Sequence, residues 1–400
     1  MSNQFPKNWA YSLPSAIALM APFDLLAALA MDIYLPVIPT MPAELGTSPG
    51  IIQLTLSVYM LVLGLGQMIF GPLSDRVGRR PVLLGGALLF SAASLALAMT
   101  QSGVPFVVLR TLQALGASAA LVATFATVRD VYADSPESST IYGLFSSMLA
   151  AVPALGPIVG SAIALAFDWR AIFFILSLLG LIAFVRALPR WHETRPERRD
   201  VHQPAVARIL TSGEFWVYTL GFSAAMGAFF VFFSTAPRVL VGRAGLSQFE
   251  FSMAFSTVAI AMIVASRLTK SLVSRWGVPG CLSRGLLVMM AGALIQAINA
   301  MLFLPSVIAF VLPMWLVAVG IVIVASVTAN GALRDFAEVS GTAVALYYCI
   351  QSLIVGGVGT ILTFVLPGDT AWPLVAYCFG LPAISLMAQS TLRSKCRKQG

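Results

Sequence analysis

Three ionisable side chains lie well inside long apolar stretches of the sequence: Asp24, Asp32 and Arg110. A charge at the centre of a bilayer costs about 2.5–3.5 kcal/mol on insertion scales, so such residues are rare and usually functional. Burial raises the proton affinity of a carboxyl group, whereas a nearby guanidinium lowers it. A carboxyl group held between these influences can bind and release a proton as its access to water changes. The chemistry available to these residues is therefore proton exchange coupled to transport.

The spacing of the two aspartates suits a shared cavity. Eight residues of helix give about 12 Å of rise and about 80° of rotation, so both carboxyl groups can face one cavity at different depths. A structural role is the alternative for each residue. Asp24 and Arg110 could form an ion pair that joins two helices, and Asp32 could be solvated near the membrane boundary.

The composition places these residues in a membrane protein. Of 400 residues, 58% are hydrophobic and only 10% are charged, and the mean hydropathy is +0.90. A soluble domain carries roughly 25% charged residues, and a helix that crosses a bilayer needs about 20 apolar residues. The candidate helices are 13–33, 51–70, 82–100, 104–127, 141–166, 171–189, 214–237, 249–269, 284–303, 306–329, 339–365 and 371–392. The sequence therefore predicts an all-α membrane protein with twelve transmembrane helices.

One long polar segment divides these helices into six and six. We predict an N-terminal six-helix bundle over residues 1–189, a cytoplasmic linker over residues 190–212, and a C-terminal six-helix bundle with a cytoplasmic tail over residues 213–400. Both histidines, His192 and His202, lie in the linker without a metal partner at helical spacing, and we expect them to be solvated. The four cysteines have no metal or redox spacing, so neither a disulfide nor a metal site is expected.

The positive charges predict the orientation of the chain. Loops on the cytoplasmic side of a membrane protein carry most of its lysines and arginines. Four of the 24 basic residues lie elsewhere: Arg170, Arg238 and Arg243 fall in the opposite loops, and Arg110 lies inside a helix. The net charge of +8 is therefore a topology signal that places both termini in the cytoplasm, and a nucleic-acid role is disfavoured.

A motif follows the second candidate helix and has a weaker copy in the second half. Residues 71–81 read GPLSDRVGRRP, and residues 273–277 read VSRWG about half the chain further on. Such a degenerate repeat is typical of duplicated transporter halves. The first string resembles the loop signature G-x-L-x-D-R-x-G-R-[RK] of the major facilitator superfamily. The signature residues are Gly71, Asp75, Arg76, Gly78, Arg79 and Arg80.

Two further motifs resemble the same family. Residues 110–117 (RTLQALGA) are similar to R-x-x-Q-G-x-G-A, with Ala114 in place of a glycine. Residues 156–161 (GPIVGS) resemble the antiporter motif G-P-x-x-G-G, with a serine in the last position. Its matching residues are Gly156, Pro157 and Gly160. Proline removes a helix hydrogen bond and glycine permits close packing, so we expect a kink there.

Longer strings narrow the resemblance to one branch. Residues 21–36 (APFDLLAALAMDIYLP) look like the drug:proton antiporters of the Bcr/CflA type. Residues 122–132, 229–237, 313–317 and 329–333 resemble the chloramphenicol and florfenicol exporters. The resemblance extends from about residue 9 to about residue 390.

The resemblance implies a fold and a function. The fold would be two six-helix bundles around a central cavity, and the function would be proton-coupled efflux of phenicol antibiotics across the bacterial inner membrane by alternating access. Asp24, Asp32 and Arg110 would couple proton to substrate, and residues 71–81 would form a cytoplasmic gate. The protein would be a monomer that needs no cofactor beyond the proton gradient, with a small neutral aromatic drug, protons and the bilayer as its partners.

A phenicol site should be mostly apolar, with a few polar groups that fix the orientation of the drug. Candidate contact residues from a helical reading are Tyr34, Thr55, Tyr59, Phe229, Phe233, Tyr347, Tyr348 and Gln351. Each of these side chains could instead pack against a neighbouring helix or face lipid.

Other functions remain alternatives. A multidrug:proton antiporter for other lipophilic compounds would use the same features, whereas a sugar site would need more polar groups than these helices offer. An intramembrane enzyme would need a nucleophile with a base, or metal ligands, at membrane depth, and no candidate helix contains a histidine. A channel is disfavoured by the two matched halves and the gate motif.

Overall fold

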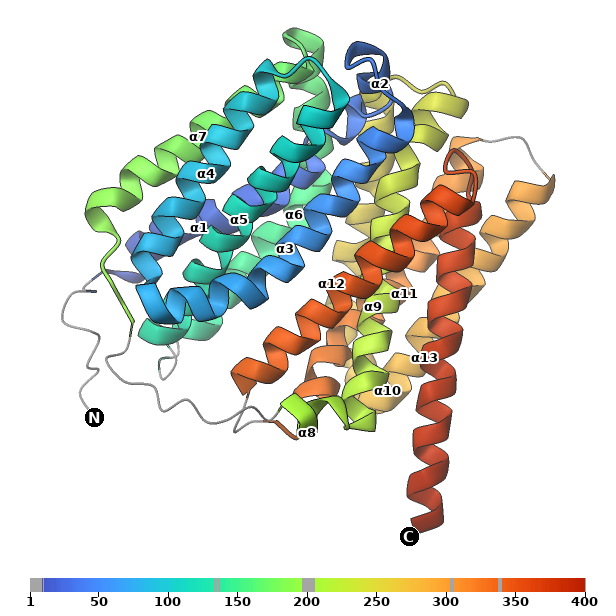
Figure 1. Cartoon of the computed structure of the whole chain (residues 1–400). Helices are drawn as coiled ribbons and strands as arrows, with labels where there is room; N and C mark the ends of the chain where they lie inside the picture. Colours follow the sequence, from blue (N-terminus) through green and yellow to red (C-terminus); the bar gives the residue numbers. More distant parts are fainter. Residues whose placement is uncertain are drawn as a thin grey trace. The chain divides into compact units, whose positions relative to one another are not determined.

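In the computed structural model the chain folds into two compact units, Met1–Val201 and His202–Gly400 (Figure 1). The structure describes residue 9, residues 11–132, residue 135, and residues 137–195, 206–302, 306–336 and 340–399. Residues 196–205 of the predicted linker, including His202, lie outside the described residues. The described part of the chain consists of helices and their connections and contains no strand.

The first unit contains six long helices and two short ones. They are α1 (Leu13–Asp32), η1 (Leu35–Val37), α2 (Met41–Glu44), α3 (Pro49–Val77), α4 (Arg79–Met99), α5 (Gly103–Tyr132), α6 (Glu137–Ala166) and α7 (Trp169–Arg190). Helix α4 packs against α5 and α7, α3 packs against α5, and α1 contacts α5, α6 and α7 (Figure 1).

The second unit begins with a short helix and is organised around α9. Its elements are α8 (Val206–Leu210), α9 (Gly213–Pro237), the π-helical segment η2 (Arg238–Arg243), α10 (Gln248–Leu302), α11 (Val307–Leu333), α12 (Ser340–Val365) and α13 (Trp372–Gln399). Helix α9 contacts α11, α12 and α13, and α10 packs along α11 (Figure 1).

Ten helices in the described part of the chain are long and apolar enough to cross a membrane. Helix α10 supplies two spans, because Gly277 (φ 66°, ψ 171°) interrupts its 55 residues. Helix α6 is 30 residues long and contains the apolar run Ala151–Ala166. With these two additions each unit has six long helices, so the predicted all-α class and the number of spans agree with the structure.

Large apolar side chains point outward where a soluble protein would carry charge. Phe167 is 79% exposed, Ile308 75% and Met99 73%. Between the helices, small residues allow the backbones to approach. A Cβ on Gly86 of α4 would lie 2.7 Å from the carbonyl oxygen of Gly116 of α5, and the reverse distance is also 2.7 Å. Outward apolar side chains and small residues at helix contacts are the pattern of a protein solvated by lipid.

The prediction of a loop over residues 71–81 is wrong. Helix α3 continues to Val77 and α4 begins at Arg79, so only Gly78 separates them. Gly78 has φ 110°, a value that a residue with a Cβ rarely adopts. The polar residues before it had suggested a loop, but charged side chains are compatible with a helix that extends beyond the apolar layer.

Candidate functional site

Arg110 of α5 is fully buried and lies between two aromatic rings. Its guanidinium carbon is 4.5 Å from the centre of the Tyr34 ring and 4.4 Å from that of Tyr59. A cation stacked on an aromatic face gains about 2 kcal/mol or more when both groups are desolvated. The two rings therefore offset part of the cost of burying this charge.

One nitrogen of Arg110 donates hydrogen bonds to residues of two helices, α1 and α5. Its Nη1 donates to the carbonyl oxygen of Ala30 at 3.0 Å and to Oε1 of Gln113 at 2.5 Å. Gln113 Nε2 in turn donates to Ser94 Oγ at 2.8 Å. Nε and Nη2 of Arg110 are buried without a hydrogen-bond partner among the described residues. A buried guanidinium with two uncommitted nitrogen atoms is suited to bind an acceptor that arrives and leaves.

The tyrosines that stack on Arg110 are themselves fixed. The hydroxyl oxygen of Tyr34 lies 2.9 Å from Thr55 Oγ1, and Tyr59 Oη donates to the carbonyl oxygen of Ala27 at 2.9 Å. Tyr34, Thr55 and Tyr59 are all completely buried. The structure therefore brings these three predicted contact residues together around Arg110, and we call Tyr34, Tyr59 and Arg110 the arginine clamp.

Both aspartates of α1 are buried, but neither pairs with the clamp. Asp24 is 4% exposed and Asp32 is 6% exposed. Among the described carboxylates none lies within 4.0 Å of the Arg110 guanidinium. Asp24 Oδ2 is buried without a hydrogen-bond partner among the described residues. The structural alternative, an ion pair between Asp24 and Arg110, is therefore not found, and neither is solvation of Asp32.

The glycines of the antiporter-like motif pack directly on the end of α1. A Cβ on Gly156 of α6 would lie 3.1 Å from Cβ of Asp32, and a Cβ on Gly160 would collide with the carbonyl oxygen of Ile33. Pro157 lies between them inside α6. Glycine at both positions is what lets α6 cover the backbone around Asp32.

The gate motif surrounds a buried arginine. Arg79 is 1% exposed, and its guanidinium contacts Asp75 at 2.6 Å, Asp130 at 2.7 Å and Ser74 Oγ at 2.7 Å. Asp130, in the last turn of α5, was not among the predicted site residues. Its only sequence signal is the string Arg129-Asp130 at the end of an apolar run. Arg80 donates to the carbonyl oxygen of Leu188 at 2.8 Å.

The predicted contact residues of the second unit fall into two groups. Phe229 and Phe233 of α9 join an aromatic cluster with Phe255 of α10, with ring centres 6.5 and 5.9 Å from it. Tyr347 of α12 is completely buried and stacks on Phe222 of α9 at 4.9 Å. Its hydroxyl group lies near the side chain of Thr328 of α11.

The two remaining candidates of α12 differ from each other in exposure. Gln351, one turn further along the helix, is 6% exposed, whereas Tyr348 is 38% exposed. Phe222, which stacks on Tyr347, was not among the predicted contact residues. One more phenylalanine in an apolar helix carries no distinctive signal.

A model of the Major Facilitator Superfamily matches residues 24–360 of the chain. The chain belongs to this superfamily. Its closely similar relatives include a chloramphenicol resistance protein of Pseudomonas aeruginosa, which is 48% identical over 98% of this chain and 94% of that protein. The multidrug resistance protein MdtL of Shewanella oneidensis is 28% identical over 62% of this chain and 63% of its own length.

Solved structures show the same fold at low identity. A peptide transporter, POT, crystallised with sulfate, has a TM-score of 0.75 and 16% identity over 96% of this chain and 94% of that chain. A bacterial homologue of the human lysosomal transporter Spinster, inward-facing and unoccupied, has a TM-score of 0.71 and 15% identity over 94% of each chain. The predicted major facilitator fold is therefore confirmed, and the protein is a multi-pass transporter rather than an enzyme.

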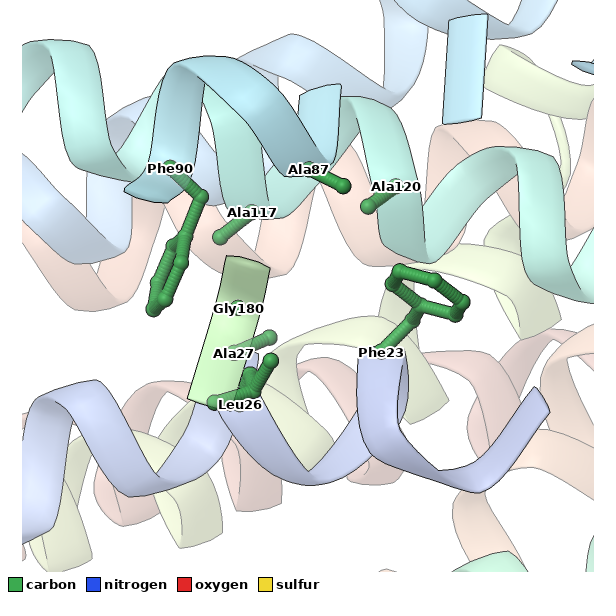
Figure 2. Close-up of a pocket in the computed structure, with 8 residues that line it drawn as sticks. All are labelled: Phe23, Leu26, Ala27, Ala87, Phe90, Ala117, Ala120 and Gly180. Carbon is green, nitrogen blue, oxygen red and sulfur yellow. The ribbon is translucent and has the colours of Figure 1, made fainter. Parts of the chain in front are cut away.

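A small cavity of this facilitator lies between α1, α4, α5 and α7 (Figure 2). It is bounded by Phe23, Leu26, Ala27, Ala87, Phe90, Ala117, Ala120 and Gly180, which come from α1, α4, α5 and α7. These side chains carry no polar atom, and the space holds no more than about one water-sized molecule. The cavity is therefore a packing gap within the first unit and is too small for a drug.

Proposed function

We propose that this facilitator exports chloramphenicol from the cytoplasm across the bacterial inner membrane in exchange for protons. The observation that carries the proposal is the 48% identity to a chloramphenicol resistance protein over 98% of this chain. The aligned region spans 395 residues of this chain and therefore includes residues from both units. Both termini would lie in the cytoplasm, as the distribution of basic residues predicts, and one chain would be the transporting unit.

The arginine clamp and the aspartates of α1 support the proton part of the proposal. Asp24 and Asp32 would take up a proton on the outer side and release it on the inner side. Among the described residues the hydrogen-bond partners of Arg110 are at its Nη1, so its Nε and Nη2 could bind a hydroxyl or amide oxygen of the drug. A proton on either aspartate would change the electrostatic potential at Arg110 and thereby the affinity for the drug.

Each unit, taken by itself, carries aromatic side chains that are suited to the apolar part of a drug. Tyr34 and Tyr59 offer ring edges beside Arg110, and Tyr347 with Gln351 offers a ring and an amide on α12. Thr55 in the first unit, and Phe229 and Phe233 in the second, are the further candidates for contact with the drug. Residues 71–80, with Arg79 held by Asp75 and Asp130, would act as the cytoplasmic gate, and Gly156, Pro157 and Gly160 would shape the approach to Asp32.

The proton gradient is sufficient as the energy source, without a cofactor. A neutral drug exchanged for a proton moves one positive charge inward. Each pH unit supplies about 1.4 kcal/mol, and each 100 mV adds about 2.3 kcal/mol per charge. A single proton could therefore maintain a drug gradient of more than tenfold, since 1.4 kcal/mol corresponds to about a factor of ten.

Accumulation of radiolabelled chloramphenicol in a drug-sensitive bacterium that expresses the chain tests this proposal. We expect low accumulation that rises to the level of cells without the transporter when a protonophore collapses the gradient. Unchanged accumulation in cells with abundant transporter would refute the assignment of this substrate and leave the fold intact.

The MdtL relatives favour one alternative, export of several lipophilic drugs. A panel of such compounds in the same cells distinguishes the two functions. Resistance confined to chloramphenicol and florfenicol supports a phenicol exporter, whereas resistance to structurally unrelated compounds supports a multidrug antiporter.

A further inference from the structure

Residues 191–195 of the linker follow α7 and pack against the first unit. Trp191 is 1% exposed, and its ring centre lies 5.4 Å from that of Trp9 and 5.7 Å from that of Phe23. Thr194 Oγ1 lies 3.4 Å from Thr127 Oγ1, in α5. We call residues 191–195 the brace, because they follow α7 and contact Phe23 of α1 and Thr127 of α5.

The brace reaches the gate motif through one carboxylate. Glu193 Oε1 accepts a hydrogen bond from the backbone N–H of Arg79 at 2.8 Å, and Oε2 accepts from the N–H of Arg80 at 3.2 Å. These are the first two residues of α4, whose N–H groups have no partner inside the helix. A carboxylate at this position also interacts favourably with the helix dipole. A linker residue therefore caps the helix that carries Arg79.

The brace itself is held by the same carboxylate and by the gate. Glu193 Oε1 also accepts from the backbone N–H groups of Thr194 at 3.1 Å and Arg195 at 3.0 Å. The Arg195 side chain donates to the carbonyl oxygen of Arg76, in the last turn of α3. Both sides of the break at Gly78 are thus tied to the linker.

Gly78 is shaped for this contact. A Cβ at this position would collide with the Glu193 carboxylate, and the φ of 110° independently favours glycine. The second copy of the motif provides an internal comparison. Gly277 has a similar backbone (φ 66°, ψ 171°), but the nearest atom to its Cβ position is Pro279 Cδ at 3.9 Å. Both copies of the motif therefore bend at a glycine, Gly78 and Gly277. The contact with a carboxylate, that of Glu193, is found at Gly78.

We propose that Glu193 is a positioning residue of the transporter that holds Arg79 on Asp75 and Asp130 by capping the start of α4. Because the capped N–H and the gate guanidinium belong to the same residue, loss of the cap loosens both. The linker thereby controls how firmly the gate is closed, although no residue of the linker belongs to the gate motif. The inference rests on the proposed function for the gate role of residues 71–80 and for its transport readout.

Three variants of the full-length protein test this role. Glu193→Ala removes all the contacts, and Glu193→Gln keeps one acceptor oxygen but loses the charge. Glu250→Ala is the matched control, because Glu250 also caps a helix, α10, with contacts of 2.9 and 2.8 Å to Ser247 of the same turn. Two quantities are measured for each: amide hydrogen–deuterium exchange of residues 79–82, and the maximal rate and KM of chloramphenicol efflux per folded transporter.

We expect exchange at residues 79–82 to be about tenfold faster in Glu193→Ala, because charge-assisted hydrogen bonds to those amides are lost. The maximal efflux rate should fall about tenfold while KM changes less than about twofold, since the drug site is not touched. Glu193→Gln should be intermediate in both quantities, and Glu250→Ala should match the wild type in both.

Exchange at residues 79–82 that equals the wild type in Glu193→Ala overturns the proposal. So does faster exchange with an unchanged maximal rate, because the cap would then be only structural. A wild-type protein that exports no chloramphenicol contradicts the proposed function alone. The exchange rates, together with proton-driven export of any compound that the protein does carry, would then still decide the role of Glu193.

Discussion

At the scale of single residues, Arg110 shows how a full charge is kept at membrane depth. Two tyrosine rings and two acceptors surround it, and lysine could not reproduce this geometry because its ammonium is not planar. We expect Arg110→Lys to lower the initial rate of chloramphenicol efflux per transporter at least about tenfold, from the loss of contacts worth about 2 kcal/mol. Rates in everted vesicles, normalised to the amount of protein, measure this.

Tyr34→Phe is the matched control for the clamp. It keeps the ring that stacks on Arg110 and removes only the hydrogen bond to Thr55. A neutral hydrogen bond contributes about 0.5–1.5 kcal/mol, so efflux should fall by less than about tenfold. A lysine variant as active as the wild type would show that a stacked guanidinium is not required.

Asp24 supports a separate prediction about proton coupling. Within the part of the chain that the structure describes, its Oδ2 is buried without a hydrogen-bond partner, and asparagine preserves the shape while removing the ionisable group. We expect Asp24→Asn to abolish drug-induced proton uptake in proteoliposomes and to make the drug affinity independent of protonation at this position. The unfolding temperature should stay the same or rise, because a buried unpaired charge is destabilising. The exposed Asp335→Asn should behave as the wild type. Normal proton uptake in Asp24→Asn would contradict this prediction and would assign the proton-coupling role to Asp32.

Much of this site is visible in the sequence, and the part that is not has a physical reason. A charge inside an apolar run is conspicuous, so Asp24, Asp32 and Arg110 could be predicted. The stacking of two tyrosines on Arg110 depends on how α1, α3 and α5 pack. The spacing of residues along a single helix gives no information about this packing. Asp130 and Glu193 look like ordinary charged residues at helix ends until the contacts with Arg79 are seen.

At the scale of elements, the contact between α6 and α1 depends on one missing Cβ. A side chain at position 160 would collide with the carbonyl oxygen of Ile33, so Gly160→Ala must push α6 away from the end of α1. Overpacking of this kind typically costs about 1–3 kcal/mol. We expect a lower unfolding temperature and an efflux rate reduced about tenfold or more, measured on the purified protein and in cells.

Gly143→Ala, on the same helix, is the control for that change. No atom lies within 4 Å of its Cβ position, and alanine favours a helix over glycine by about 1 kcal/mol. Stability should therefore stay the same or rise, and efflux should not change. If both alanine variants behaved alike, the effect at position 160 would come from helix propensity rather than from contact with α1.

The extent of each helix was predictable where apolar residues define it and was misjudged where they do not. Helix α1 ends at Asp32 and α9 ends at Pro237, within a residue of the predicted boundaries. Helix α3 continues for seven residues beyond the predicted end at residue 70, because Gly71–Val77 accept helical geometry outside the apolar layer. Hydropathy predicts which residues need lipid and carries no information about where a helix stops in water.

At the scale of the whole molecule, the boundary between the two units suggests how the chain can be divided. The first unit extends to Val201 and contains the brace, whose contacts are to α1, α3, α4 and α5. We expect residues 1–201 and 202–400, co-expressed as separate chains, to restore chloramphenicol resistance. Either fragment alone should give none, since each carries only six of the transmembrane helices.

A second division places the cut between residues 190 and 191, so that the brace belongs to the other fragment. All residues are still present, but Glu193 is no longer covalently attached to α7, and its capping of α4 becomes a bimolecular contact. The effective concentration of a short tethered segment is in the millimolar range, and cutting the tether removes it. We therefore expect resistance from this pair to be clearly lower than from the pair divided after residue 201, at equal amounts of membrane-inserted protein. Equal resistance from the two pairs would mean that the brace binds the first unit without its connection to α7, so that the position of the linker along the chain does not matter for the gate.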